Sequence, residues 1–160
     1  MRSGVRIACD VGTVRIGIAR SDATGMLAVP LDAVRAGEHA VAEVAGIAGE
    51  WDALEVLVGL PLSMDGTERS SAALARAWAA GLAAAVPMPV RLVDERLSTV
   101  QAQRGLHEAG KSTRQSRARI DSASAVVFLQ AALDTEARTG LPAGVDVRRA
   151  GDTSERGKGQ

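Results

Sequence analysis

The chain has 160 residues, of which 46% are hydrophobic and only 2% aromatic. This length supports one domain with a proper core and is too short for two. Nineteen basic residues balance nineteen acidic ones, so no global field attracts nucleic acid, and such binding has to come from a local patch. There is no membrane-length apolar run, no signal-peptide core and only one cysteine, Cys9. These features predict a cytoplasmic protein with no membrane contact and a buried, unpaired thiol.

The first stretch with strong patterning predicts a β-hairpin. Two apolar strands, Val5–Cys9 and Arg15–Arg20, are joined by a tight turn that contains Gly12, the usual choice where φ must be positive. Asp10 stands at the end of the first strand, where apolar alternation predicts another core side chain. Because a buried carboxylate is costly unless it is paired or bound to a cation, Asp10 is the first candidate for chemistry.

The next segments continue the sheet and add a helix. Met26–Val34 predicts a third strand, and Pro30 places it at or near an edge. Glu38–Trp51 carries apolar residues at helical spacing, and Leu54–Val58 is a short apolar run typical of a buried parallel strand. A loop rich in helix and strand breakers follows at Gly59–Gly66.

A second helix is expected after this loop, with Asp65 as its N-cap and Glu68 three residues later. Its buried stripe is predicted to contain Leu74, Trp78 and Leu82. Val90–Val93 then predicts another buried strand.

Ser98 and Gln101 form a capping box for a helix that ends near Gly110. After a polar, basic segment, the last helix is expected from about residue 119 to 138. The glycine- and charge-rich remainder predicts a disordered tail over residues 139–160, which leaves residues 1–138 as the folded domain.

This order of elements predicts an α/β fold. The sheet is mixed and five-stranded, with an antiparallel meander of the first three strands, two parallel strands and helices on both faces. If the first, fourth and fifth strands run parallel, their carboxyl ends share one edge, where open α/β sheets bind ligands. That edge collects Asp10, the Gly59–Gly66 loop and the pair Asp94-Glu95.

Asp121 is a further carboxylate that can reach this edge. Its spacing to Ala125, Phe128 and Ala132 places it on the buried face of the last helix. Converging carboxylates repel one another unless cations neutralise them, and oxygen-only ligands favour Mg²⁺ or Mn²⁺ over zinc.

Each acid also has an ordinary structural explanation. Asp121 can simply favour the positive end of a helix. Asp94 and Glu95 can be a solvated loop end that pairs with Arg96. Strand alternation lets only one of these two face Asp10, without deciding which.

Four blocks of the sequence are, in order, CDVGTVRIGIARSD, VGLPLSMDGTERS, VDERLSTVQAQ and IDSASAVVFLQ. They resemble the signature blocks of the YqgF family, also called RuvX or pre-16S rRNA nucleases, which have an RNase H-like fold. The resemblance covers residues 5 to about 135, with Ser124 departing from the expected Ala. It implies a catalytic, metal-binding triad of Asp10, Glu95 and Asp121 and hydrolysis assisted by two Mg²⁺ (or Mn²⁺) ions.

A cluster of basic residues precedes Asp121 and is the candidate nucleic-acid-binding surface: Arg104, Lys111, Arg114, Arg117 and Arg119. The alternative is a solvated basic loop. Arg15, which is matched in the family block, is expected to neutralise the carboxylates or to contact phosphate. The role of Ser63 is open, and His39 and His107 are expected at the surface.

The leading functional hypothesis is an endonuclease for structured nucleic acid, acting in 5′-end maturation of pre-16S rRNA. A second is a Holliday junction resolvase, which needs a dimer, whereas the sequence leaves monomer or homodimer open. A third is a nucleic-acid-binding module that no longer cleaves. A nucleotide-binding ATPase is a fourth, but the chain is too short for its second lobe.

Overall fold

The computed structural model describes residues 1–98 and 121–148. The basic cluster at residues 104–119 therefore lies outside the described residues. Of the capping box, Ser98 is described and Gln101 is not. The elements are β1 Arg6–Val11, β2 Arg15–Ser21, β3 Ala28–Arg35, α1 Ala40–Glu50, β4 Glu55–Leu60, α2 Ser70–Ala85, β5 Val90–Asp94, the 3₁₀ helix η1 Glu95–Ser98, α5 Ala123–Thr139 and β6 Val145–Asp146.

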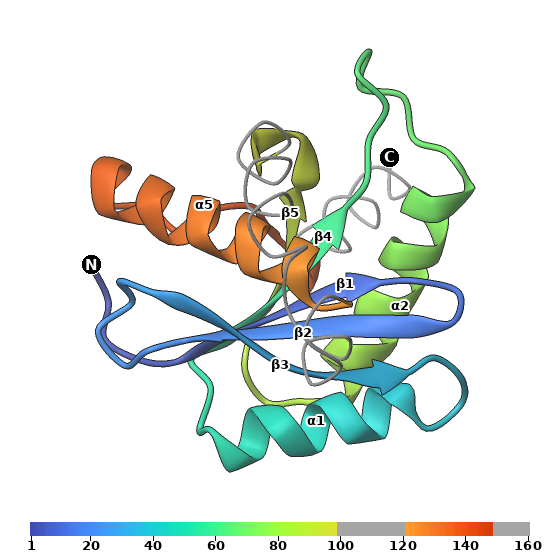
Figure 1. Cartoon of the computed structure of the whole chain (residues 1–160), viewed down its shortest axis with the longest axis horizontal. Helices are drawn as coiled ribbons and strands as arrows, with labels where there is room; N and C mark the ends of the chain where they lie inside the picture. The colour runs from blue at the N-terminus through green and yellow to red at the C-terminus, as the bar shows by residue number, and fades with distance from the viewer. Residues whose placement is uncertain (99–120, 149–160) are drawn as a thin grey trace, which may run out of the picture.

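The sheet has the order β3-β2-β1-β4-β5-β6 (Figure 1). The first three strands form the expected antiparallel meander, and β1, β4 and β5 run parallel. β3 occupies the edge, where Pro30 costs the sheet no ladder hydrogen bond with a further strand. The mixed α/β fold is thus confirmed, with six strands in place of the five predicted.

Helices cover both faces of the sheet, with α5 on one and α1 and α2 on the other (Figure 1). Alternation along β1 sends Ile7 and Cys9 into the core beneath α1 and α2, and Ala8 into the core beneath α5 with Phe128. Asp10, two residues after Ala8, therefore belongs to the α5 face. Burial raises the pKa of the Cys9 thiol, as befits an inert core cysteine.

Helix α5 is anchored at both ends. At its start, the Ser122 hydroxyl accepts from the Ile18 N–H at 3.0 Å and donates to the Leu31 carbonyl at 2.8 Å. Near its end, Glu136 pairs with the fully buried Arg6 at 3.1 Å and with Arg2 at 2.7 Å. Charges buried this deeply need such partners, because removing one leaves the other uncompensated.

The start and the buried face of α2 differ from the sequence-based expectation. The helix begins at Ser70, with Arg69 as N-cap, so Asp65 does not cap it. Asp65 instead accepts from the Thr67 N–H at 2.9 Å inside the preceding loop, a local turn that competes with capping. Leu74 is 39% exposed, because the helix turns a different stripe toward the sheet. Leu82 is buried as predicted, together with four alanines: Ala72, Ala75, Ala79 and Ala83.

Trp51, the last apolar residue of the helical pattern in Glu38–Trp51, is 39% exposed. It stands at the end of α1, and the Arg20 guanidinium lies over its ring, 4.3 Å from the centroid. A cation over an aromatic face compensates part of the incomplete burial of the indole.

The predicted tail begins too early. Val145 and Asp146 pair with β5 as strand β6, and Arg91 donates to the Ala143 carbonyl at 2.9 Å. Arg148 donates to the Ala83 and Val86 carbonyls, both at 2.8 Å, at the end of α2. These bonds join distant segments, so the local composition that suggested disorder carries no sign of them. Residues 149–160 lie outside the described part.

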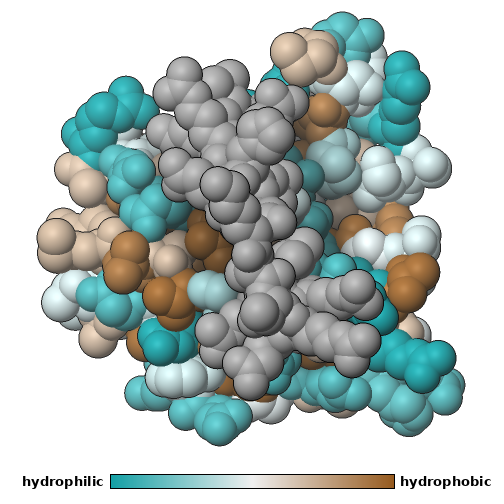
Figure 2. Space-filling model, in the orientation of Figure 1, coloured by the Kyte–Doolittle hydropathy of each residue, from teal (hydrophilic) through white to brown (hydrophobic). Residues whose placement is uncertain are grey.

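The surface near the end of β3 is hydrophilic. Teal side chains cover the lower right of Figure 2, over the end of β3 and the loop to α1. Within the described residues, no helix combines the length and the apolar character needed to cross a bilayer.

Candidate active site

Asp10 lies in β1 between two glycines of the neighbouring strands. In β2 its direct partner is Gly17. In β4, Val58 pairs with Cys9, so Gly59 is the residue beside Asp10 on that side. Neither neighbour has a side chain, which leaves space on the α5 face at both sides of the Asp10 carboxylate.

The backbone of Asp121 and Ser122 fills the space over Gly17. A Cβ atom on Gly17 would overlap the Asp121 carbonyl oxygen and would lie 3.1 Å from the Ser122 Cα. Together with the bonds of the Ser122 hydroxyl, this close approach fixes Asp121 beside β2. Asp121 stands two residues before α5, which begins at Ala123, and not inside the helix as expected.

The side chain of Glu95 fills the space over Gly59. A Cβ atom on Gly59 would overlap the Glu95 Oε1 and would lie 2.9 Å from its Cγ and Cδ atoms. Val93 of β5 faces α5, so alternation turns Asp94, the last residue of the strand, away from that face. Glu95 begins η1, and its contact with Gly59 places its side chain on the α5 face. The structure thus decides which of the two acids lies beside Asp10.

The two neighbouring acids have opposite electrostatic environments. Burial, the negative charge of Asp10 and a hydrogen bond with Asp10 raise the pKa of Glu95 to about 8. Arg96 bonds to the Asp94 carboxylate, with one contact of 2.6 Å, and holds the pKa of Asp94 below its usual range. The environment of Glu95, which is partly buried, therefore disfavours its ionised form, whereas the ion pair of Asp94 favours the ionised form of that residue.

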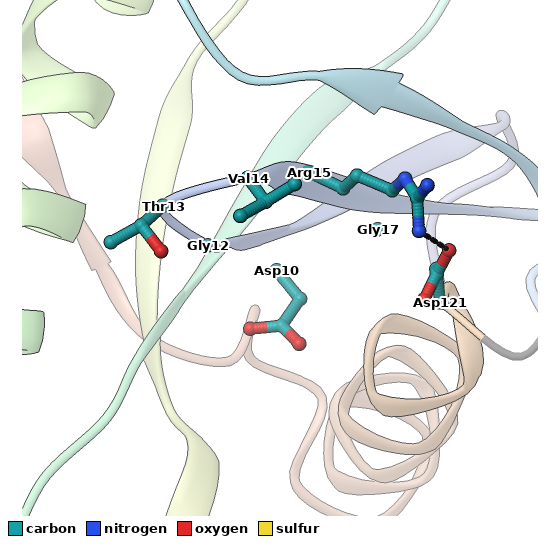
Figure 3. A pocket seen from close by; sticks show the side chains of 7 residues that line it. All are labelled: Asp10, Gly12, Thr13, Val14, Arg15, Gly17 and Asp121. Carbon is teal, nitrogen blue, oxygen red and sulfur yellow. Dashed lines mark hydrogen bonds and ion pairs between the residues drawn. The ribbon is translucent and has the colours of Figure 1, made fainter.

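An open pocket of about 300 Å³ lies at this place. In Figure 3 the carboxylates of Asp10 and Asp121 lie on the α5 side of the β1–β2 hairpin, and Arg15 extends along β2 to Asp121. The Arg15 Nη1 contacts the Asp121 Oδ2 at 2.9 Å, so Arg15 does neutralise one of the acids. The pocket is lined by Asp10, Gly12, Thr13, Val14, Arg15, Gly17 and Asp121.

The chemical type of the donor atoms fits a hard divalent cation. Asp10 and Glu95 offer only oxygen atoms, and a bound cation would favour the ionised form of Glu95, whose pKa is raised by burial and by the charge of Asp10. Asp121 is held by Arg15. Among residues 1–98 and 121–148, no three acidic, histidine or cysteine side chains are grouped closely enough to form a ready-made metal site.

The three expected acids thus share one face, Asp10 with Glu95 on one side and Asp121 on the other. Sequence reasoning missed Gly17, Gly59 and Ser122, which make that arrangement possible. A signal existed for the glycines, because each interrupts a strand of large apolar residues, which often marks a close backbone approach. The expected phosphate-binding residues Arg104, Lys111, Arg114, Arg117 and Arg119 lie outside the described residues.

Comparison with known proteins agrees with this description. Residues 4–135 match the family RuvX, described as Holliday junction resolvase. A Thermobifida fusca protein named "Putative pre-16S rRNA nuclease" is 49% identical over 152 residues, covering 90% of this chain and 96% of its own length. Proteins of the same name from a Nocardioides strain (90% of this chain, 96% of the relative) and from Mycobacterium ulcerans (82% and 79%) are 50% and 53% identical.

Among solved structures, Thermus thermophilus RuvC in complex with a Holliday junction substrate has a TM-score of 0.59 at 17% identity. The match covers 89% of this chain and 99% of RuvC. At this identity the likeness concerns the fold, which is RNase H-like in agreement with the sequence-based expectation. Since the family match spans nearly all of the folded part and the relatives are about half identical, the chain belongs to the RuvX family.

Proposed function

We propose that this chain is a metal-dependent endonuclease that hydrolyses phosphodiester bonds of structured nucleic acid in the 5′-end maturation of pre-16S rRNA. Family membership and the names of relatives about half identical to this chain support this activity and substrate. The observation that carries the chemistry is the placement of Glu95 and Asp121 on either side of Asp10 through two bare glycines. A role in ribosomal RNA maturation agrees with the cytoplasmic location expected from the sequence.

In this proposal Asp10, Glu95 and Asp121 hold Mg²⁺ or Mn²⁺, with two ions in the active complex. When bound, such ions would provide an activated water molecule and charge stabilisation for the leaving oxygen. The chain's own residues prepare the site. Gly59 leaves room for the Glu95 carboxyl group, Ser122 fixes the backbone beside Asp121, and Arg15 balances the Asp121 charge at the pocket rim.

The test is cleavage of a precursor 16S rRNA fragment by purified protein with Mg²⁺ or with EDTA. Asp10→Asn, Glu95→Gln and Asp121→Asn are expected to keep the fold and to reduce cleavage roughly 100-fold or more. Asp94→Asn is the matched control, since it removes one negative charge next to Glu95 from a side chain that faces Arg96. It is expected to retain cleavage. Full Mg²⁺-dependent cleavage by Asp10→Asn would contradict the assignment.

A Holliday junction resolvase is the second candidate, favoured by the description of the matched family. A synthetic four-way DNA junction, tested beside the RNA under the same conditions, separates the two. Paired symmetric cuts in the junction and no cut in the RNA would favour the resolvase. Binding of either substrate without any cleavage would favour a non-cleaving module.

A further inference from the structure

Two arginines stand directly opposite each other at the end of the β2–β3 ladder. Arg15, the first residue of β2, pairs with Arg35, the last residue of β3. Directly opposite residues in an antiparallel pair have Cβ atoms about 4.5–5.5 Å apart, and like charges there destabilise the sheet. Asp121 balances part of the Arg15 charge, and an anion between the two side chains would relieve the repulsion that remains.

Both arginines belong to the face that carries the candidate active site. Ile16 and Val34, the next pair along the ladder, point into the core beneath α1 and α2. Alternation then sends Arg15 and Arg35 to the α5 face, together with Asp10. Figure 3 shows Arg15 on this side, reaching toward Asp121.

The two guanidinium groups have donors to offer. The Arg15 side chain is 61% exposed and uses Nη1 for Asp121, which leaves other N–H donors of its five. Arg35 is exposed. Within the described residues its side chain has no ion pair or hydrogen bond, although Asp32 and Glu38 each lie three positions away in the sequence.

We propose that Arg15 and Arg35 form a phosphate-binding pair that holds the sugar–phosphate backbone of the substrate on the β3 side of the active site. Guanidinium groups bind phosphate oxygens through paired N–H donors. A phosphate of the nucleic acid bridges the two like charges, and the scissile region then lies over the pocket that Arg15 borders. This rests on the proposed function only in taking nucleic acid as the substrate.

The experiment measures binding without cleavage, by fluorescence anisotropy in EDTA, of one hairpin sequence made as RNA and as DNA. The dissociation constant is recorded between about 50 and 200 mM salt. Arg35→Ala is expected to weaken binding of both probes roughly threefold to tenfold and to reduce the salt slope by about one. Arg35→Lys, which keeps the charge, is expected to retain the slope.

Arg138→Ala is the matched control, because it removes an exposed arginine near the far end of α5. It is expected to leave both the affinity and the slope unchanged. Identical slopes for Arg35→Ala, Arg138→Ala and the unsubstituted chain would overturn the proposal, as would no binding of either probe.

The outcome is separable from that of the nuclease assignment. A chain that binds through Arg35 in EDTA but does not cleave with Mg²⁺ supports the arginine pair and contradicts the nuclease. A chain that cleaves with Mg²⁺, and whose salt slope is unchanged by Arg35→Ala, supports the nuclease assignment and contradicts the arginine pair.

Discussion

The arrangement of acids around Asp10 depends on the absence of side chains at its neighbours Gly17 and Gly59. Gly17 admits a backbone and Gly59 admits a side chain, so the two glycines are not equivalent. A backbone packed by a helix has little freedom to move, whereas the end of a glutamate side chain can rotate away. Substitution at the two positions should therefore separate stability from activity.

We expect Gly59→Ala to displace the Glu95 carboxyl group, whose Cγ and Cδ atoms would lie 2.9 Å from the new Cβ. Cleavage should fall roughly 100-fold, as for other misplacements of about 1 Å, with little change in the free energy of unfolding. Gly17→Ala should lower that free energy by roughly 1–3 kcal/mol, because the obstacle is the backbone ahead of α5. Urea denaturation and Mg²⁺-dependent cleavage of both variants check this, and equal stability losses would contradict it.

The raised pKa of Glu95 makes stability depend on pH. The pKa is about 8 in the folded chain against an ordinary value of 4.5, so the folded state binds the proton more tightly than the unfolded state. The resulting stabilisation of the protonated form is fully present below about 4.5 and is lost as pH rises toward 8.

Glu95→Gln removes this dependence because its amide does not ionise. In EDTA, we expect the variant to match the unsubstituted chain near pH 4 and to be more stable by roughly 1–3 kcal/mol near pH 8, allowing for partial exposure of the group. Thermal unfolding across this pH range measures the difference. A difference that stays constant with pH would show that Glu95 does not carry it.

At the scale of elements, α5 determines where Asp121 lies. Its first turn is bonded to β2 and to the Leu31 carbonyl through Ser122, and its last turns to β1 through Arg6 and Glu136. A helix held at both ends cannot slide along the sheet without breaking buried bonds. The position of a catalytic candidate is thus set by contacts at both ends of a 17-residue helix.

The segment after α5 also makes tertiary contacts that should stabilise the fold. We expect a chain ended after residue 138 to lose roughly 2–4 kcal/mol of unfolding free energy relative to one ended after residue 148. The shorter chain lacks strand β6 and the bonds of Arg91 and Arg148 to distant carbonyls. Urea denaturation of the two chains gives the comparison, and equal midpoints would mean that β6 contributes nothing to stability.

At the scale of the whole molecule, the order of strands brings the acids together. β1 lies between β2 and β4. The start of α5 therefore packs on one side of Asp10, over β2, and the residue after β5 packs on the other side, over β4. Parallel pairing of β1, β4 and β5 puts their carboxyl ends at the same edge. With no net charge on the chain, the electrostatics of the site come from local pairs such as Arg15 with Asp121.

Much of this follows from local patterns. Alternating β-branched residues predicted the hairpin, Pro30 predicted the edge strand, and an acid in a strand position drew attention to Asp10. The motif blocks identified the family, which the comparisons confirm. These features can be predicted from the sequence because each depends on a few consecutive residues or on their fixed spacing.

Other features depend on which segment lies next to which, and only the tertiary structure decides that. From alternation alone, Asp94 and Glu95 were equal candidates, until the α5 face and the bare Gly59 selected Glu95. Ser122 gains its role from two backbone groups on β2 and β3, and β6 from its pairing with β5. A sequence period states that a side chain has two possible faces, whereas the packing of distant segments determines what each face meets.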